Sequence, residues 1–495
     1  MKLNKFFFLV ASLLPLLSIA QEKKPNIVWI FSDDHSYQTI GAYGGRLQTL
    51  NPTPNIDKLA AQGMRFDKAY VENSICAPSR ATLLTGKMSH LHKKLDNTKK
   101  TIFDHDQQQF QKILRQNGYQ TAMIGKIHLP GKMQGFDYWE VLPGQGKYYN
   151  PDFITEEGDT NYKGEYVTDV ITDRALNWLE NERDQDKPFM MMVHHKAPHR
   201  NWDPAERYMN KYEDVEIPEP DNFFDDYSTR TTAAHKQEMD IATSMKIDSD
   251  LKAEGERYAN DPRYKERFAK FKADNLEGKD LVKWKYQTYM KDYLRCIWSV
   301  DESVGEIMAS LKEQGLDENT IVIYSSDQGF YMGEHGWFDK RFMYEESFRT
   351  PLIVKWPGTI KPGSVNTDLV QNIDFAETFL DLADAPIPDD MQGKSVVPLL
   401  KGKAPEDWRK SMYYHYYEYP GAHAVRRHEG VANKRYKLIR FYGEDVPNGE
   451  EWEFYDLKND PSEMNNIYGT SATEKKVSEM KKELSELRTQ YAVTQ

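Results

Sequence analysis

The chain has little cysteine: its 495 residues contain two, Cys76 and Cys296. This excludes a framework of several disulfides, although the two cysteines could pair with each other in an exported protein. Positive charge is also in deficit, because 77 Asp and Glu residues outnumber 65 Lys and Arg residues and give a formal net charge of -12. An acidic chain is a poor general binder of nucleic acid, so any positive field that attracts an anion must be local.

Long hydrophobic runs are lacking after the first twenty residues, which excludes a membrane-spanning helix in that part of the sequence. Within residues 1–20, Lys2 and Lys5 precede an apolar run that starts at Phe6, and 18–20 form a small-residue cleavage site. The run is too short for a comfortable transmembrane helix. We therefore expect an exported chain, periplasmic or secreted, with no membrane insertion.

Strand-like and helix-like segments alternate along most of the chain. Apolar runs typical of buried strands occur at 26–31, 189–193 and 320–324, and helical spacing occurs between them, for example at 167–182. This alternation predicts an α/β fold with a doubly wound, mostly parallel sheet.

Two regions depart from that alternation. Residues 203–292 are charged, rich in tyrosine and poor in strand signals, so we expect a mostly helical insertion that covers a site, binds a partner or forms a solvated surface. Aromatic strands from residue 411 and a helix at 474–490 predict a small antiparallel sheet with one packed helix. The expected organisation is a signal peptide at 1–20, a catalytic domain at 21–404 and a C-terminal subdomain at 405–495.

Charged side chains follow the ends of the predicted strands. Asp33 and Asp34 come just after the first apolar run, and adjacent carboxylates repel, so a bound cation is their natural compensation and a solvated turn the alternative. Lys126 and His128 follow a short strand and are two residues apart, so an extended backbone points both toward one side, where they could face an anion. A surface lysine and a packed histidine are the alternative.

Two later strands deliver further polar groups. His199 follows the run at 189–193, and Asp327 and Gln328 follow the run at 320–324. In doubly wound folds, ligands bind beyond the carboxyl ends of the strands. The residues that one edge of the sheet could gather are Asp33, Lys126, His199 and Asp327.

The segment 76–86, C-A-P-S-R-A-T-L-L-T-G, has the layout of a nucleophile at the start of a helix. Pro78 suits the first helical turn and Gly86 suits the C-terminal stop. The free N–H groups at a helix start attract an anion, and Arg80 adds a positive fork suited to an oxyanion. A buried structural cysteine before an ordinary helix is the alternative interpretation.

The pattern Cys-x-Pro-Ser-Arg-x-x-x-x-Thr-Gly closely resembles the signature of the formylglycine-dependent sulfatases, which belong to the alkaline phosphatase superfamily. The likeness extends along nearly the whole mature chain, through the segments 53–63, 125–128 and 198–199. It implies the alkaline-phosphatase-like fold with a smaller C-terminal domain. It also implies that a maturation enzyme oxidises Cys76 to formylglycine, whose hydrate attacks the sulfur of a sulfate ester, and it leaves Cys296 as a core thiol.

The resemblance further implies a role for each candidate residue. One calcium ion, with magnesium the less favoured choice, would be held by Asp33, Asp34, Cys76, Asp327 and Gln328. The family has Asn where Gln328 stands, so this ligand departs from the pattern by one methylene. The catalytic residues would be Cys76, Arg80, His128 and His199. The substrate-binding residues would be Lys126, Lys340, His335, His423 and His428. For the last three histidines, a structural turn or a satisfied surface cluster is the alternative.

The stretch 195–202, H-K-A-P-H-R-N-W, most resembles glycosaminoglycan sulfatases, among them the N-acetylglucosamine-6-sulfatases. The expected substrate is therefore N-acetylglucosamine-6-O-sulfate of a heparan-type glycosaminoglycan. The alternatives are a sulfatase for uronate 2-O-, galactosamine 4- or 6-O- or N-sulfates, and a formylglycine-dependent phosphonate or phosphate monoesterase. From a different class, the alternative is an inactive glycan-binding homologue with unconverted Cys76, which the mass of the peptide 70–87 would reveal.

Overall fold

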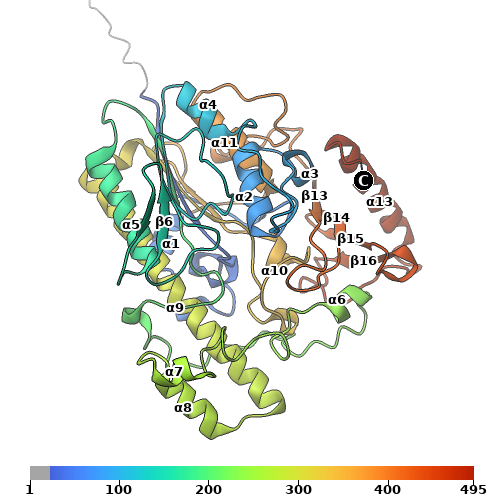
Figure 1. Cartoon of the computed structure of the whole chain (residues 1–495). Helices are drawn as coiled ribbons and strands as arrows, with labels where there is room; N and C mark the ends of the chain where they lie inside the picture. Colours follow the sequence, from blue (N-terminus) through green and yellow to red (C-terminus); the bar gives the residue numbers. More distant parts are fainter. Residues whose placement is uncertain (1–22, 495) are drawn as a thin grey trace, which may run out of the picture.

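Residues 23–494, the part of the chain that this computed structural model describes, contain a ten-stranded sheet and a separate four-stranded sheet (Figure 1). The large sheet has the order β11-β2-β10-β9-β1-β8-β4-β5-β6-β7. Its adjacent central strands are parallel: β9 (Thr320–Ser326), β1 (Asn26–Ser32), β8 (Phe189–His194), β4 (Gln120–Gly125) and β5 (Tyr138–Val141). The doubly wound, mostly parallel sheet predicted from the sequence is confirmed. The predicted signal peptide lies outside the described residues.

Antiparallel pairs occur on both sides of this parallel centre, between β9 and β10, β10 and β2, β5 and β6, and β6 and β7. The outer strands are β10 (Leu352–Lys355), β2 (Met64–Phe66), β11 (Ser364–Asn366), β6 (Asp152–Thr155) and β7 (Asp159–Asn161). Two short strands, β3 (Ala69–Tyr70) and β12 (Val370–Gln371), pair with each other beside the large sheet.

The register aligns the carboxyl ends of the central strands. Ser32 at the end of β1 pairs with Ser326 at the end of β9, and Phe31 pairs with His194 at the end of β8. Gly125 at the end of β4 also pairs with His194. The residues that follow these four strands therefore leave the sheet at one level and on one edge.

Helices cover both faces of the large sheet because side chains along its buried strands alternate between two cores. Val28 and Ile30 of β1 pack in the core beneath α1 (Pro54–Gln62), α5 (Val167–Asn177) and α9 (Gly278–Glu313). Ile27 and Trp29 pack in the opposite core beneath α2 (Cys76–Thr85), α4 (Phe110–Gln116) and α11 (Phe375–Leu382). The remaining short helices of this region are α3 (Ser89–His92), α10 (Glu345–Phe348) and α12 (Val397–Leu400).

The helix predicted after Ile75 is α2, which begins at Cys76. Gly86 ends it with a φ of 64° and donates its N–H to the carbonyl of Thr82 at 2.8 Å. This is the left-handed C-terminal stop that glycine accommodates without a Cβ clash. The helix therefore starts at the candidate nucleophile itself.

The C-terminal region contains the antiparallel order β13-β14-β15-β16. Its elements are β13 (Ser411–Tyr416), β14 (His428–Asn433), β15 (Tyr436–Tyr442), β16 (Glu450–Asp456) and α13 (Glu474–Gln490). Met480 and Leu484 of α13 pack with Tyr413, Leu438 and Phe454 on one face of this sheet. The small sheet with one packed helix is as predicted.

The segment 203–292 is less helical than the sequence predicts. Before α9 begins, it contains one 3₁₀ turn at Glu206–Tyr208 and three short α-helices, and it is otherwise built mainly of turns. These helices are α6 (Thr232–Lys236), α7 (Glu256–Asn260) and α8 (Lys265–Asp274). Prolines at 204, 218 and 220 and frequent aspartates favour turns over helix in its first part. Within residues 23–494, no helix combines the length and apolar character that crossing a membrane requires.

Gly125 is held in a conformation that suits only glycine. Its φ is 103°, and a Cβ on it would lie 2.0 Å from the carbonyl oxygen of His194. We expect Gly125→Ala to lower the free energy of unfolding by about 2–4 kcal/mol, because the methyl group must push β4 and β8 apart. Chemical denaturation of the purified variant measures this loss.

Gly118→Ala is the matched control. Gly118 has a φ of 89°, but among the described residues no atom beyond its chain neighbours lies within 4 Å of the position that an added methyl group would take. This change therefore isolates the backbone penalty, and we expect it to lower stability by about 1 kcal/mol. Equal losses in the two variants would contradict the steric account of Gly125.

Candidate active site

The carboxyl edge of the large sheet gathers the acidic residues. Asp33 and Asp34 follow β1 and Asp327 follows β9, and each has one carboxylate oxygen in a group whose atoms all lie within 4.8 Å of one another. All three are fully buried, and Asp34 donates its backbone N–H to Asp327 Oδ1 at 3.0 Å. Burial raises the pKa of Asp34 to about 6, with Lys340 opposing and Asp327 adding to the shift.

Helix α2 delivers Cys76 and Arg80 to the same place. Cys76 Sγ belongs with Asp33 and His199 to a second group of atoms that all lie within 4.8 Å of one another. Arg80 is one helical turn further on and therefore shares this face of the helix. Its guanidinium donates to Asp327 Oδ2 at 3.1 Å and lies 3.7 Å from Asp33 Oδ1.

Two lysines reach the carboxylates from separate loops. Lys126, directly after β4, contacts Asp33 Oδ2 and also donates to Gln145 Oε1. Lys340 comes from the loop before α10, and its Nζ lies 2.7 Å from Asp34 Oδ2. Burial alone would lower the pKa of Lys340, but the carboxylate of Asp34 raises it above the ordinary value of lysine. Lys340 is therefore charged throughout the physiological range.

The acidic group has the chemistry of a site for a hard cation. Gln328 donates Nε2 to Asp34 Oδ1 and lies 3.8 Å from Cys76 Sγ. Its Oε1, together with Asp33 Oδ1, is buried and has no hydrogen-bond partner among the described residues. Buried oxygen atoms normally have a partner, and carboxylate and amide oxygens are the ligands that Ca²⁺ and Mg²⁺ prefer. These residues could hold a metal ion.

One ring nitrogen of His199 faces the acidic centre formed by Asp33, Asp34 and Asp327. Its Nδ1 donates to the carbonyl of Arg200, which leaves Nε2 facing Asp34 Oδ2 at 3.8 Å. Burial, with the positive charges of Lys126 and Lys340, holds the pKa of His199 well below the ordinary value. The imidazole is therefore neutral when no anion is bound.

His128 follows Lys126 in a left-handed conformation with a φ of 56°. Burial and the positive charges of Lys126 and Arg80 lower its pKa well below the ordinary value. Burial also raises the pKa of the Cys76 thiol to about 12. An unmodified Cys76 is thus a neutral thiol rather than a reactive thiolate.

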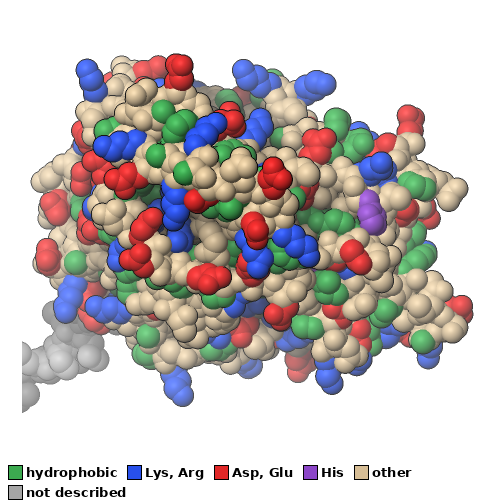
Figure 2. Space-filling view, turned by 90° about the horizontal axis from the view of Figure 1, so that it is seen from below, with side chains coloured by type: hydrophobic (Ala, Val, Ile, Leu, Met, Phe, Trp, Pro, Cys, Tyr) green, Lys and Arg blue, Asp and Glu red, His purple; other side chains and the backbone are tan. Residues whose placement is uncertain are grey.

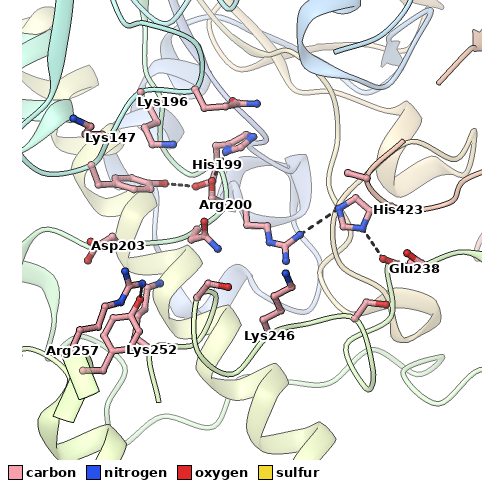
Figure 3. A pocket seen from close by; sticks show the side chains of 18 of the residues that line it. Lys147, Lys196, His199, Arg200, Asp203, Glu238, Lys246, Lys252, Arg257 and His423 are labelled. Carbon is pink, nitrogen blue, oxygen red and sulfur yellow. Dashed lines mark hydrogen bonds between the residues drawn. The ribbon is translucent and has the colours of Figure 1, made fainter. Parts of the chain in front are cut away.

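A cavity of about 1240 Å³ opens beside His199 (Figure 3). Its basic lining residues are Lys147, Lys196, Arg200, Lys246, Lys252 and Arg257. Its acidic lining residues are Asp203 and Glu238. By contrast, acidic and basic side chains are interspersed over the face seen in Figure 2. The cavity therefore has the local excess of basic side chains that an anionic ligand requires on this acidic protein.

The segment 203–292 forms one wall of this cavity. Residues of the segment that line it include Thr243, Ser244, Lys246, Lys252, Arg257 and Tyr258. Lys252 is anchored by donation to the carbonyls of Trp202 and Asp250. Of the alternatives that the sequence leaves open for this segment, the structure favours the one in which it covers the site.

His423 reaches the cavity from the C-terminal region. It donates Nδ1 to the carbonyl of Glu238 at 2.6 Å and accepts at Nε2 from Arg200 at 3.3 Å. Arg200 in turn makes a two-pronged ion pair with Asp250, at 2.8 and 2.7 Å. The large domain, the insertion and the C-terminal region therefore meet at the cavity (Figure 3).

His335 and His428, for which the sequence predicts substrate binding, do not line the cavity. His335 is fully buried, with Nδ1 at 2.8 Å from Asp225 Oδ2. His428 is fully buried among aromatic rings, donates Nδ1 to the carbonyl of Arg426 and accepts at Nε2 from the N–H of Met343. Both side chains are therefore held by contacts inside the fold.

Several residues at the site carry no strong local signal in the sequence. Asn97 accepts the N–H of Ala77 at 3.0 Å and so fixes the first turn of α2, and Gln145 contacts Lys126. Asn97 and Gln145 lie in irregular segments, where no periodicity indicates which face is buried. Lys196 also lines the cavity, and its place three residues before His199 is the one signal that could have drawn attention to it.

Known proteins resemble this chain over most of its length. Residues 25–385 match the family model described as Sulfatase, and residues 333–490 match the model described as N-sulphoglucosamine sulphohydrolase, C-terminal. An N-acetylglucosamine-6-O-sulfatase of Bacteroides thetaiotaomicron is 47% identical, over 95% of this chain and 87% of that protein. The N-acetylglucosamine-6-sulfatase of Homo sapiens is 29% identical, over 80% of this chain and 68% of that protein.

One solved structure is similar throughout. It is a protein in complex with its substrate, D-glucosamine-2-N,6-O-disulfate, and it superposes with a TM-score of 0.90 at 46% identity. The match covers 95% of this chain and 99% of that one.

Proposed function

The chain belongs to the sulfatase family and is a sulfuric ester hydrolase, and from this premise we propose that it removes the 6-O-sulfate of N-acetylglucosamine-6-O-sulfate in heparan-type glycosaminoglycan. The choice of sugar rests on the 47% identity with an N-acetylglucosamine-6-O-sulfatase. The basic cavity beside the acidic centre supports a saccharide that carries sulfate.

Two groups that the chain would acquire fit the centre. A single Ca²⁺ held by Asp33, Asp34, Asp327 and Gln328 would withdraw negative charge from the sulfate oxygens. Formylglycine, made at Cys76 by a maturation enzyme, would supply as its hydrate the nucleophile for sulfur. The buried and neutral thiol of Cys76 supports the need for this conversion, because a thiol with a pKa of about 12 is a weak nucleophile at neutral pH.

The side chains around the metal site and residue 76 would bind the sulfate and orient the nucleophile. Lys126 and Lys340 would bind the sulfate oxygens, since their ammonium groups already lie against the carboxylates of the centre. Arg80 and His128 would orient residue 76, and Arg80 is fixed for this by Asp327.

His199 would protonate the departing sugar oxygen. The leaving oxygen gains negative charge as its bond to sulfur breaks, and a proton delivered in that step lowers the barrier. His199 Nε2 faces the centre while Nδ1 is held by the carbonyl of Arg200. Burial and, after it, the positive charges of Lys126 and Lys340 keep His199 neutral in the free site. A bound anion would offset the lysine charges and so favour the uptake of a proton by His199 from solvent.

We also propose the organisation and location of the mature protein. The signal pattern at 1–20 supports export to the periplasm or the medium, and the two separate sheets support a catalytic domain at 21–404 and a subdomain at 405–495. Sequencing the N-terminus of the exported protein tests the first part: a start at residue 21 is expected.

The test of the proposed function is sulfate release by matured enzyme from a panel of singly sulfated sugars. The panel comprises N-acetylglucosamine-6-sulfate, galactosamine 4- and 6-sulfates, N-sulfated glucosamine and 2-sulfated uronates, with a phosphate monoester beside them. We expect release from the 6-sulfated glucosamine alone. Release from another sugar would replace the substrate, and phosphate release in preference to sulfate would overturn the sulfatase chemistry.

Lys340→Ala should reduce turnover far more than stability. The change removes a positive charge that would bind a sulfate oxygen, and we expect kcat to fall by about 10²- to 10³-fold. The loss in unfolding free energy should stay near 1–3 kcal/mol, provided that the metal compensates Asp34. Initial rates of sulfate release and denaturant unfolding of the same preparation give the two numbers.

Lys437→Ala is the matched control, because Lys437 is also fully buried and ion-paired, at 3.1 Å from Glu345 and 2.9 Å from Glu463. It lies in the C-terminal sheet, away from the cavity. We expect a loss of about 3–5 kcal/mol in stability with the kcat of the folded enzyme unchanged. The same pattern for both lysines would make Lys340 a structural residue.

A further inference from the structure

Lys196 is a buried cation with no acidic partner. The residue is 4% exposed, and no carboxylate of residues 23–494 lies within ion-pair distance of its Nζ. The carboxylate of Asp34 acts on this ammonium from beyond ion-pair distance, and the ring of Tyr148 lies closer, with its centroid 4.7 Å from Nζ. The two lysines of the centre differ in this respect, because Lys126 contacts Asp33 and Lys340 contacts Asp34.

A cation in this position is poorly compensated by the protein alone. Removing an ammonium group from water is unfavourable unless an opposite charge or several hydrogen-bond acceptors replace the water. Burial accordingly lowers the pKa of Lys196 to about 8. A bound anion would supply the negative charge that the described part of the protein does not place beside Lys196. The environment of this side chain therefore favours the binding of an anionic ligand.

The direction of Lys196 identifies where that ligand would lie. Lys196 lines the cavity, and Figure 3 shows its side chain on the same side as His199, pointing into the hollow. Lys246 and Arg257 face the hollow from the insertion, and neither side chain has a carboxylate within ion-pair distance among the described residues. Cations without acidic partners thus line the cavity both beside His199 and on the side formed by the insertion.

We propose that Lys196 binds a second anionic group of the substrate, separate from the sulfate that is removed. This inference rests on the proposed function, because the 6-sulfate must occupy the acidic centre before the rest of the sugar lies in the cavity. The reacting sulfate would already be bound by Lys126, Lys340 and the cation, which leaves Lys196 for another group. The preferred substrate is therefore a glucosamine 6-sulfate that carries a further anion, on its own ring or on the neighbouring sugar.

Steady-state kinetics with matched substrates tests the proposal. N-acetylglucosamine-6-sulfate has one anionic group, D-glucosamine-2-N,6-O-disulfate has a second on the same ring, and a disaccharide of uronate and N-acetylglucosamine-6-sulfate has it on the neighbouring sugar. We expect kcat/KM to be about 10- to 100-fold higher for one of the doubly anionic substrates, as a hydrogen-bonded charge pair would give. Lys196→Met should abolish this preference and change kcat/KM for the singly sulfated sugar by less than about threefold.

Two further variants separate charge recognition from other effects. Lys196→Arg keeps the charge and should keep part of the preference, whereas Lys482→Met removes a charge from the exposed surface of α13 and should change nothing. Equal losses on singly and doubly anionic substrates with Lys196→Met would show that Lys196 acts on the reacting sulfate and would overturn the proposal. Unchanged kinetics on all substrates would overturn it as well.

Binding of a product provides a measurement that is independent of turnover. Calorimetry with Cys76→Ala protein would compare glucosamine-2-N-sulfate and the uronate disaccharide product with N-acetylglucosamine. One of the anionic products should bind about 10-fold more tightly than the neutral one, and Lys196→Met should remove the difference. If 6-sulfated glucosamines are not hydrolysed at all, the proposed function fails. If they are hydrolysed without any preference for a second anion, the function stands and this inference fails.

Discussion

Cys76→Ala should abolish sulfate release and leave the fold intact. We expect the rate to fall by at least about 10⁴-fold, because the variant lacks the residue from which the proposed nucleophile would be made and no neighbouring side chain would replace it. The free energy of unfolding should change by less than about 1–2 kcal/mol, since the variant loses only the functional group of one small buried side chain. Sulfate release and denaturant unfolding of wild type and variant provide the comparison.

The second cysteine of the chain is the matched control. Cys296 is also fully buried and unpaired in a disulfide, but it lies in α9 within the core beneath the sheet. Cys296→Ala should therefore lose about as much stability as Cys76→Ala while it retains turnover. Mass analysis of the peptide 70–87 in the wild type should show the lighter aldehyde in place of the thiol. Full activity in Cys76→Ala would exclude formylglycine chemistry.

The convergence of the acidic and basic groups could be predicted from the sequence because it depends on a few strong signals. The run N-I-V-W-I-F has no polar residue after Asn26 and is buried on both faces, and the later runs at 189–193 and 320–324 behave in the same way. Parallel strands share one carboxyl edge, so Asp33, His199 and Asp327 have to emerge near one another. The observed pairing of Ser32 with Ser326 and Phe31 with His194 fulfils this condition.

The remaining parts of the site depend on tertiary contacts that no local pattern encodes. Asn97 fixes the first turn of α2 from an irregular loop, and Asp250 orients Arg200 from the insertion. His423 and His428 are only five residues apart, yet His428 is enclosed by aromatic rings while His423 lines the cavity. The packing of His428 against Phe342 and Phe441 is a tertiary contact, so the sequence alone does not separate these two positions.

The composition of the segment 203–292 does not predict the turns that line the cavity. Its charged and tyrosine-rich sequence is compatible with a solvated helix, but its buried residues include Met245, Leu251 and Lys252, which hold turns against the large domain. Those turns present Thr243, Ser244 and Lys246 to the cavity. A regular helix would show only one face to the cavity, whereas a sequence of turns can line it along a longer path.

Removal of the metal should abolish activity, and added Ca²⁺ should restore it. We expect chelation to reduce sulfate release by about 10³-fold or more, since the cation would withdraw charge that Lys126 and Lys340 cannot withdraw alone. The melting temperature should fall as well, because a ligand at 1,000 times its Kd stabilises a fold by about 4 kcal/mol. Thermal unfolding with and without Ca²⁺ therefore reports on the site even in inactive protein.

Two aspartate variants test whether the Ca²⁺-dependent rise in melting temperature arises at the acidic centre. Asp327→Asn removes a charge from the proposed ligand group and should lose most of the Ca²⁺-dependent rise in melting temperature. Asp301→Asn alters another buried carboxylate, which accepts the N–H groups of Asn55 and Ile56 at 2.9 and 2.8 Å, so it should lower stability but keep the Ca²⁺-dependent rise. If chelated wild type retains both its activity and its melting temperature after the metal is shown to be gone, the three carboxylates must be compensated by Lys126, Lys340 and Arg80 alone. The buried oxygens of Asp33 and Gln328 that have no hydrogen-bond partner among the described residues would then need another explanation.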